Sequence, residues 1–322
     1  MGEDREDVGP SGSESVRTHE PVMVDEVLEL LELTPGMVVV DGTVGAGGHS
    51  AAMLPAITPG GVLVGLDRDS EILERARESL AESGGDSRDR SGVRLMHLEY
   101  SRMAEALEQA GIDGCDRVLL DLGVSSLHLD SPQRGFSFMH DAPLDMRMNA
   151  SAPVTAAEWL RRVSEADLAN VLFELGGERH SRRIARAVVE ARSRGKMSRT
   201  SHLVDAVRRG TPSGARRQRI HFATRTFQAV RMALNDEMGE LQRGLQAALS
   251  VLRPGGRLAV ISFHSGEDRM VKHFVREHMK PLRSKPLQAT GAERRRNPRS
   301  RSAKLRCGVV VASESGDPAR VS

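Results

Sequence analysis

The chain has 322 residues, of which 39% are hydrophobic and 28% charged, with a formal net charge of +2. This composition is typical of folded proteins and excludes disorder throughout. The chain contains no run of about 18 apolar residues, and its first 20 residues are acidic and polar, so we expect neither a membrane span nor a secretory signal. Two cysteines, Cys115 and Cys307, cannot form a disulfide framework or a multi-thiolate metal site. We therefore expect a cytoplasmic protein.

Charge is distributed unevenly along the chain. Residues 1–20 carry six acidic and two basic residues, and we expect 1–18 to form a disordered acidic tail. Residues 141–219 contain 16 basic and nine acidic residues, whereas residues 280–306 contain ten basic residues and a single acid. Both stretches are candidate surfaces for a polyanion. For residues 294–306 a disordered tail is the alternative, because a run of Arg, Asn and Ser buries little apolar surface.

Strands and helices alternate through most of the chain. Val24, Val27, Leu28 and Leu31 recur at helical spacing, which predicts a helix before Thr34. Short apolar runs predict five strands, and helices between them indicate an α/β fold with a parallel sheet. The strands are expected at 37–41, 61–67, 93–96, 117–121 and 255–262, with a helix at 72–80 and one long helix from Phe227 through Leu234 to Leu245.

The interval from 140 to 219 interrupts this alternation. Two amphipathic helices, 168–175 and 184–191, flank Gly176-Gly177, with no strand-like run between them. We interpret 140–219 as an all-helical domain inserted into a sheet domain formed by 19–139 and 220–322, and expect it to recognise the substrate. Its polar face carries Arg182, Arg183, Arg186 and Arg192, which either bind that substrate or are simply solvated.

The turns after the strands are the expected ligand site of a parallel sheet. The first strand leads into a loop with Gly45, Gly47 and Gly48, but Ser50 occupies the third glycine position of the dinucleotide fingerprint, which disfavours a dehydrogenase. Asp67 ends the second strand at the spacing where an acid binds the ribose of an adenosyl ligand. Its alternative role is to cap the following helix.

The remaining strand ends favour S-adenosylmethionine over a nucleotide. Tyr100 follows the third strand and could stack on adenine, and Asp121 ends the fourth strand, near the reacting end of the ligand. Neither Lys nor Arg occurs between Val38 and Leu66, which suits a cofactor without phosphates. His49 either contacts this ligand or caps the glycine loop. We therefore predict a Rossmann-like class I S-adenosylmethionine-dependent methyltransferase sheet carrying an inserted helical domain.

The ordered motifs between about residues 19 and 275 resemble one family, the 16S rRNA (cytosine N4)-methyltransferases called RsmH or MraW. The matching stretches are His19-Glu20-Pro21-Val22-Met23, Asp41-Gly42-Thr43, Gly45-Ala46-Gly47-Gly48-His49-Ser50, Gly65-Leu66-Asp67-Arg68-Asp69, Asp121-Leu122-Gly123-Val124-Ser125-Ser126, Arg134-Gly135-Phe136-Ser137-Phe138, Leu144-Asp145-Met146-Arg147-Met148, Arg225, Gln228-Ala229, Arg231, Asn235, Ile261-Ser262-Phe263-His264-Ser265 and Glu267-Asp268.

The resemblance implies methyl transfer from S-adenosylmethionine to the N4 amine of a cytosine in the decoding region of 16S rRNA, either free or in an assembling 30S subunit, without a metal. It places cofactor contacts on Gly47, Gly48, His49, Asp67, Tyr100, Asp121 and His128. Tyr100 stands where other members often have Phe, and His128 where Gln also occurs. Residues 83–89 look like a loop insertion on which no chemistry depends.

The reaction restricts the choice of catalytic residues. A cytosine amine is a poor nucleophile, so positioning must supply most of the rate. The Asp/Asn-Pro-Pro-aromatic motif of many amino methyltransferases is replaced here by Asp121-Leu122-Gly123-Val124. We expect Asp121 to orient the cofactor and to engage N4. The further candidates for holding the base are Asn235, Ser262 and His264.

Two other functions compete with this prediction. One is a non-enzymatic RNA-binding or ribosome-assembly protein with the same fold, and the presence of Gly47, Gly48, Asp67 and Asp121 argues against it. The other is a small-molecule or protein methyltransferase, which the two basic segments disfavour.

Overall fold

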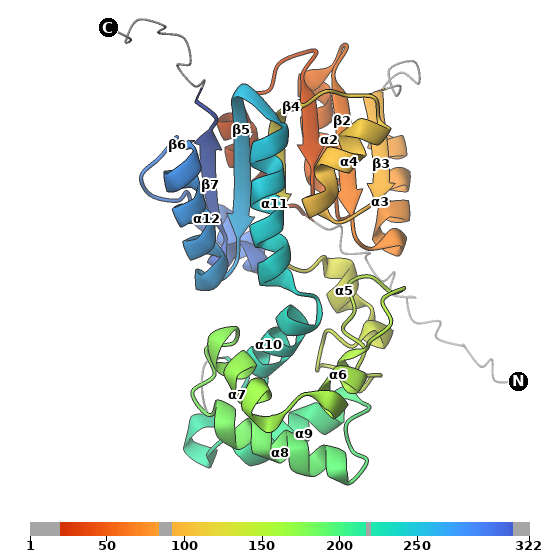
Figure 1. Cartoon of the computed structure of the whole chain (residues 1–322), viewed down its shortest axis with the longest axis vertical. Coiled ribbons are helices and arrows are strands. Elements are labelled where there is room, and N and C mark those ends of the chain that lie inside the picture. The colour runs from red at the N-terminus through yellow and green to blue at the C-terminus, as the bar shows by residue number, and fades with distance from the viewer. Residues whose placement is uncertain (1–19, 84–91, 217–219, 312–322) are drawn as a thin grey trace, which may run out of the picture.

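A computed structural model describes residues 20–83, 92–216 and 220–311. Its centre is a seven-stranded sheet in the order β3-β2-β1-β4-β5-β7-β6 (Figure 1). Strands β1 to β5 are parallel, and β7 is antiparallel to both β5 and β6. The strands are β1 (Val38–Asp41), β2 (Val62–Asp67), β3 (Val93–His97), β4 (Cys115–Asp121), β5 (Leu252–Ser262), β6 (Lys280–Pro281) and β7 (Lys304–Val309). The predicted parallel α/β sheet is confirmed.

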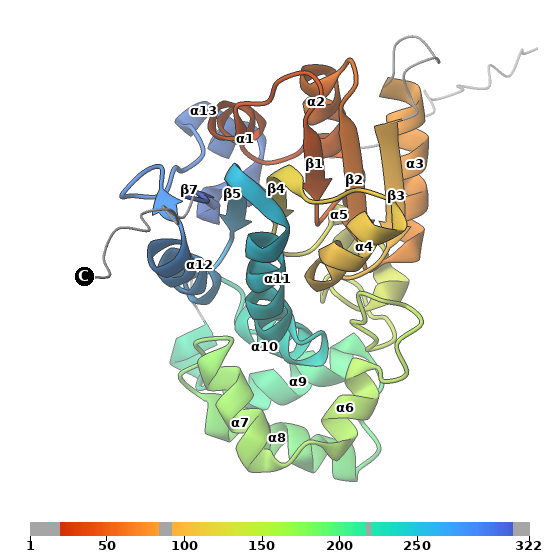
Figure 2. The same cartoon turned by 45° about the horizontal axis from the view of Figure 1, so that its top comes forward.

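Helices cover both faces of the sheet, giving three layers (Figure 2). One face packs against α1 (Val24–Leu31) and α2 (Gly48–Ile57). The other packs against α4 (Met103–Gln109), α11 (Glu237–Val251) and α12 (Ser265–His278). The central strands are buried on both sides, which explains why their sequences are continuous apolar runs. The remaining elements of this part are α3 (Ser70–Ser83), η2 (Tyr100–Arg102), α13 (Gly291–Arg296) and η5 (Pro298–Ser302).

A second, all-helical part lies below the carboxyl ends of the strands in Figure 1 and has its own hydrophobic core. Leu160, Leu168, Ile184, Leu203 and Val230 are completely buried in this core. The helices of this part are α5 (Ser126–Asp130), η3 (Pro132–Arg134), α6 (Ala156–Arg162), α7 (Glu165–Glu174), α8 (Ser181–Ser193), α9 (Thr200–Gly210), η4 (Ser213–Arg216) and α10 (Thr224–Leu234). The two predicted helices correspond to α7 and α8. The exact limits 140–219 stay a prediction, since Phe136 and α10 also contribute to this core.

The prediction of one long helix from Phe227 to Leu245 was wrong. The chain forms α10 and α11, separated at Asn235 and Asp236, and Asp236 adopts a left-handed backbone with φ of 47°. The side-chain amide of Asn235 accounts for the break. It accepts from Met148 N and donates to Met146 O, which holds Asn235 against the segment before α6. The apolar spacing continues across the break, so periodicity alone could not reveal it.

The alternative of a disordered tail at 294–306 is also wrong. This segment forms α13, η5 and β7, and several of its cations have partners. Arg296 pairs with Glu20, while Lys304 and Arg306 contact Asp268 at 3.0 Å and 2.7 Å. Lys304 and Arg306 are thus the polar positions of a strand that alternates polar and apolar residues between β5 and β6.

The described residues leave some expectations without a test. The acidic tail 1–18 lies outside them, as does most of the 83–89 loop.

Arg192 does not belong to the exposed arginines of α8, because its guanidinium donates to Leu160 O at 2.8 Å and to Val163 O at 2.6 Å. Among the residues with assigned structure, no helix has the length and apolar character needed to cross a membrane.

Candidate active site

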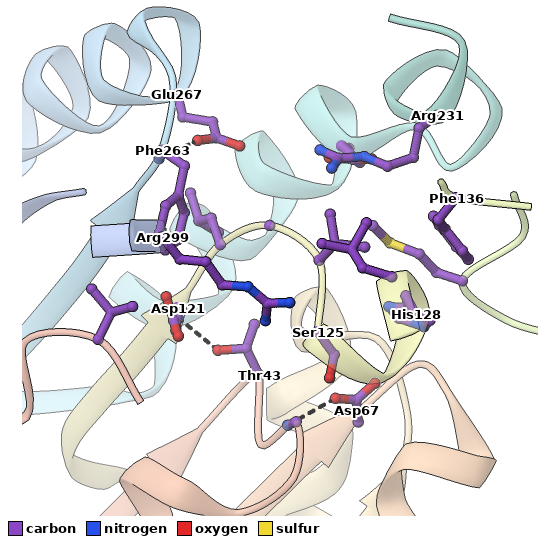
Figure 3. Close-up of a pocket in the computed structure, with 18 of the residues that line it drawn as sticks. Thr43, Asp67, Asp121, Ser125, His128, Phe136, Arg231, Phe263, Glu267 and Arg299 are labelled. Carbon is purple, nitrogen blue, oxygen red and sulfur yellow. Dashed lines mark hydrogen bonds and ion pairs between the residues drawn. The ribbon is translucent and has the colours of Figure 1, made fainter. Parts of the chain in front are cut away.

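A cavity of about 590 Å³ opens at the carboxyl ends of β1, β2 and β4. The strand order reverses between β1 and β4, which is the point where open α/β sheets bind ligands. Its volume lies in the range of small-molecule and cofactor sites. Phe136 of the helical part lines the same cavity (Figure 3). Phe227 and Gln228 of α10 line it as well. The cavity thus joins the two parts of the molecule.

The glycine loop after β1 is organised around the buried carboxylate of Asp41. Asp41 accepts hydrogen bonds from Ser50 Oγ at 2.6 Å and from the Thr43 backbone N–H at 3.2 Å. Burial raises the pKa of this carboxyl, and the bond from Ser50 partly opposes the effect. Ser50 therefore stands at the third glycine position because its hydroxyl holds the loop.

Gly47 and Gly48 have different surroundings. Gly48 lines the cavity, and a Cβ there would lie 2.9 Å from the side chain of Pro21. Gly47 precedes α2 with φ of 87°, a left-handed conformation that favours glycine. Gly47 is not among the residues that line the cavity. The structure thus brings Gly48 to the cavity wall and gives Gly47 a role in shaping the turn.

Asp67, at the end of β2, lines the cavity and holds the glycine loop close to its strand. Its carboxylate accepts from Gly45 N at 3.0 Å and from Asp69 N at 2.9 Å. Burial raises its pKa, and these two backbone bonds act against that shift. The alternative role as a helix cap belongs instead to Asp69, which accepts from Glu71 N at 3.0 Å at the start of α3.

Tyr100 lines the cavity between the sheet and α11. A Cβ added to Gly244 of α11 would lie 2.2 Å from the Tyr100 ring, so this glycine is what allows the ring to pack there. Burial raises the pKa of Tyr100 well above its usual value, and the carboxylate of Glu240 adds to the effect. The phenol is therefore neutral and held in one orientation.

Asp121 and His49 lie together at the floor of the cavity. Asp121 Oδ2 is 3.7 Å from His49 Nδ1, and the Asp121 backbone N–H donates to Thr43 Oγ1 at 2.6 Å. Asp121 Oδ1 has no hydrogen-bond partner among the described residues. Burial raises the pKa of Asp121 to about 6, with His49 opposing the shift and Asp41 adding to it.

His49 uses its other nitrogen to fix its orientation. His49 Nε2 lies 2.9 Å from the carbonyl oxygen of Val22, so this nitrogen must carry a proton to donate. The other ring nitrogen, Nδ1, faces Asp121. The histidine bridges the N-terminal segment and the strand end, and does not cap α2 through its side chain.

His128 belongs to a compensated charge network at the junction of the two parts. His128 Nε2 lies 2.8 Å from Asp69 Oδ2, which also accepts from Arg134 at 2.7 Å. Burial alone would raise the pKa of Asp69, but the bonds from His128 and Arg134 lower it to about 2. The His128 ring packs on Phe136 with centroids 4.7 Å apart and lines the cavity.

The structure separates the three candidates for holding the base. His264 lines the cavity and caps α12, where its Nδ1 accepts from Glu267 N at 3.3 Å. Asn235 does not line the cavity, and its amide is engaged with the backbone of Met146, Met148 and Arg231. Ser262 is buried, and its hydroxyl donates to Lys304 O at 3.4 Å. Of the three, only His264 is brought to the same cavity as Asp121.

Several cavity residues were not singled out from the sequence. Phe227 and Glu237 line the cavity, and Glu237 pairs with Arg231 at 2.7 Å. Arg299 of η5 reaches the cavity from the far end of the chain. The sequence could not single out Arg299, because it lies in a run of arginines and only the fold shows which of them lines the cavity. No group of His, Cys, Asp or Glu within the described ranges could hold a metal ion.

Comparisons with known proteins agree with this geometry. The model of the MraW methylase family matches residues 16–310. A relative from Geobacter sulfurreducens, named Ribosomal RNA small subunit methyltransferase H, is 48% identical over 309 residues, covering 90% of this chain and 97% of its own. A relative of the same name from Symbiobacterium thermophilum is 44% identical over 322 residues, covering 94% and 99%.

Among solved structures, the N-methyltransferase NodS from Bradyrhizobium japonicum is 9% identical, covers 90% of this chain and 94% of its own, and has a TM-score of 0.42.

The fold and the family together define a class I S-adenosylmethionine-dependent methyltransferase. The cofactor is S-adenosylmethionine, as predicted. The chain belongs to the MraW methylase family.

Proposed function

We propose that this enzyme transfers a methyl group from S-adenosylmethionine to the N4 amine of a cytosine in the decoding region of 16S rRNA. The observation that carries the proposal is the single cavity shared by the strand ends and the helical part. A base presented by the helical part would meet the cofactor at the end of β4. The substrate is 16S rRNA, free or within an assembling 30S subunit, which implies a cytoplasmic location.

The names of the relatives support ribosomal RNA of the small subunit as the substrate, since both relatives described above are named for it. The exposed arginines of α8 support it as well. Arg182 and Arg183 are exposed on the face of α8 that does not pack into the helical core. Guanidinium groups suit bidentate contacts with phosphates.

The cofactor contacts follow the strand ends. We assign the ribose to Asp67 and the adenine to Tyr100, both of which line the cavity. His49 and His128 line it too, with orientations fixed by Val22 and Asp69. Gly48 supplies a wall without a side chain, and Gly47 sets the turn that presents it.

Asp121 is the residue that we expect to act on the base. S-adenosylmethionine supplies the methyl group on a sulfonium. When the N4 nitrogen takes that methyl group, it must release one of its two protons, and the partner-free Oδ1 of Asp121 is an acceptor placed for it. A carboxyl with a pKa of about 6 is ionised at neutral pH and is still a usable base.

Before transfer, the same carboxylate would accept a hydrogen bond from N4 and hold the amine in line with the methyl group. His264 is the remaining candidate for holding the base, from the start of α12, which follows the strand next to β4. Asn235 serves the reaction in our proposal only indirectly, by fixing the break between α10 and α11.

The direct test uses the purified protein, S-adenosylmethionine and 30S subunits from cells that lack this enzyme. Digestion of the 16S rRNA and mass spectrometry should reveal one new N4-methylated cytidine in the decoding region. Methylation of another base, of another position on cytosine, or outside the decoding region would contradict the proposal. Repeating the reaction with protein-free 16S rRNA distinguishes the two forms of the substrate.

A further inference from the structure

Arg299 is a cation inside the cavity, and none of the described residues pairs with its charge. It lies in η5, and its side chain points from that helix into the cavity (Figure 3). Within the described part of the chain, its guanidinium makes no ion pair and no side-chain hydrogen bond. Burial lowers the pKa of Arg299, and the more remote carboxylate of Asp130 opposes the shift. An arginine keeps its proton under such conditions, so the positive charge persists.

The other arginines of the cavity are already compensated. Arg68 contacts Glu99 at 3.0 Å, and Arg231 contacts Glu237 at 2.7 Å. Arg299 is therefore the cavity-lining arginine that remains available to an anionic ligand. A partly buried guanidinium without a counter-ion is costly unless a ligand supplies one.

The backbone that carries Arg299 is rigidly held. Asn297 Oδ1 accepts from the Arg299 N–H at 3.2 Å, and Asn297 Nδ2 donates to Glu20 O at 3.0 Å. The buried Ser300 hydroxyl donates to Asn297 O at 2.8 Å. The same wall is completed by Glu293, which accepts from Met23 N at 2.9 Å. Arg299 is thus placed in the cavity by both ends of the chain before any ligand arrives.

We infer that Arg299 binds the α-carboxylate of the amino-acid part of S-adenosylmethionine. The cofactor carries one anionic group, that carboxylate, and its other formal charges are positive. The carboxylates of Asp67 and Asp121 cannot accept a second carboxylate favourably, whereas a guanidinium binds one in a bidentate arrangement. The inference concerns the cofactor and does not depend on which RNA nucleotide is methylated.

A phosphate of the RNA is the competing partner for Arg299. The part of the substrate that must enter the cavity is a base, which carries no charge, while its phosphates stay on the backbone. Arg299 shares its cavity with Thr43, Gly45 and Asp121 at the carboxyl ends of β1 and β4, where the cofactor lies in this class of fold. The position therefore favours the cofactor carboxylate.

The test compares two ligands that differ only in this carboxylate. S-adenosylhomocysteine keeps it, whereas its decarboxylated analogue, 5′-deoxy-5′-(3-aminopropylthio)adenosine, lacks it and retains the amine. Calorimetry on the full chain should give an Arg299→Met variant that binds S-adenosylhomocysteine about 10- to 100-fold more weakly than the wild type. Its affinity for the analogue should stay within about twofold of the wild-type value.

Two further variants make the result specific. Arg299→Lys keeps the charge but loses the bidentate geometry, so it should recover part of the affinity. Arg301→Met changes an exposed arginine of the same short helix that does not line the cavity, so both ligands should bind it normally. Thermal melting of each variant reports whether the wall remains folded.

Three outcomes would overturn the inference. Arg299→Met could weaken the binding of both ligands equally, which would mean that Arg299 only contributes to the packing of the wall. It could leave the binding of both ligands unchanged and instead flatten the salt dependence of RNA binding, which would mean that Arg299 contacts an RNA phosphate. Finally, the wild type could bind neither ligand, which would remove the cofactor assignment together with this inference, whereas failure of RNA methylation alone would leave it standing.

Discussion

Two aspartates at the carboxyl edge of the sheet, Asp69 and Asp121, differ in how their charge is balanced. At the junction with the helical part, Asp69 has both His128 and Arg134 as partners, and its pKa falls to about 2. At the floor of the cavity, Asp121 has one histidine at 3.7 Å and an oxygen without a partner, and its pKa rises to about 6. The compensated carboxylate joins two parts of the molecule, whereas the uncompensated one is available to a substrate.

Removing the compensated carboxylate should have the largest effect. Asp69→Ala leaves Arg134 and His128 without their shared partner in a buried place, and we expect the free energy of unfolding to fall by about 3–5 kcal/mol. Chemical denaturation measures this. Glu71→Ala is the matched control, because it removes the exposed partner of the same arginine and should cost no more than about 0.5 kcal/mol. Equal costs for both variants would contradict the distinction.

Asp121→Asn should leave the fold intact and reduce the chemistry. It keeps the shape of the side chain but loses the base, so the single-turnover rate should fall by about 100-fold even with saturating S-adenosylmethionine. Rapid-quench measurement of methyl transfer to 30S subunits gives this rate. Full recovery of the rate of Asp121→Ala by excess cofactor would restrict Asp121 to orienting the cofactor and would leave His264 as the candidate for contacting N4.

Asp67→Ala should weaken the binding of the cofactor. The ribose would lose hydrogen bonds to a charged group, and we expect the binding free energy to become less favourable by about 1.5–3 kcal/mol. Calorimetry with S-adenosylmethionine measures it. Asp67 also holds the backbone N–H of Gly45, so Asp67→Asn, which keeps one acceptor, should recover part of the affinity. Unchanged affinity in the Ala variant would remove the ribose assignment.

The pH dependence of stability should differ in sign between the two carboxylates. Asp121 binds its proton more tightly when folded than when unfolded, so protonation between about pH 6 and pH 4 stabilises the fold. Relative to Asp121→Asn, the wild type should gain up to about 2 kcal/mol as the pH falls from 7 to 4. Asp69, with its lowered pKa, loses stability only as the pH falls from about 4 towards 2. Denaturation curves at several pH values measure the difference, and a constant difference would contradict it.

The smallest effect is expected at the exposed arginines of α8. Replacing Arg182 and Arg183 by Ser should flatten the dependence of RNA affinity on salt by nearly one unit of log–log slope for each phosphate that the variant no longer binds. Fluorescence anisotropy with a 16S rRNA fragment measures the slope. An unchanged slope would mean that this face is simply solvated. Deleting residues 280–306 is unsuitable for this purpose, because it would remove β6, α13, η5 and half of β7.

The elements that could be predicted from the sequence are those with a clear local pattern of apolar residues. Continuous apolar runs located β1, β2 and β4, since strands buried on both faces have little freedom in composition. β7 was not predicted, because Lys304–Val309 alternates polar and apolar residues inside a basic run. Its assignment depends on pairing with β5, which is a long-range contact that no local window contains.

The site was predictable to the same extent. Glycines and carboxylates at strand ends marked Gly48, Asp67 and Asp121, because the end of a strand is a position that sequence can locate. The sequence could not separate Asn235, whose amide supports a loop, from His264, which reaches the cavity. That difference depends on which direction a side chain takes after the fold has formed.

The wall made by both ends of the chain has a consequence for synthesis. Glu20 and Met23 are synthesised early, whereas Asn297 and Glu293, the residues to which they bond, are synthesised more than 200 residues later. At about 5–20 residues per second, a nascent chain exposes its finished strands β1 and β2 for many seconds before Arg299 exists. The wall that carries Arg299 is therefore completed only after residues 293–300 have been synthesised.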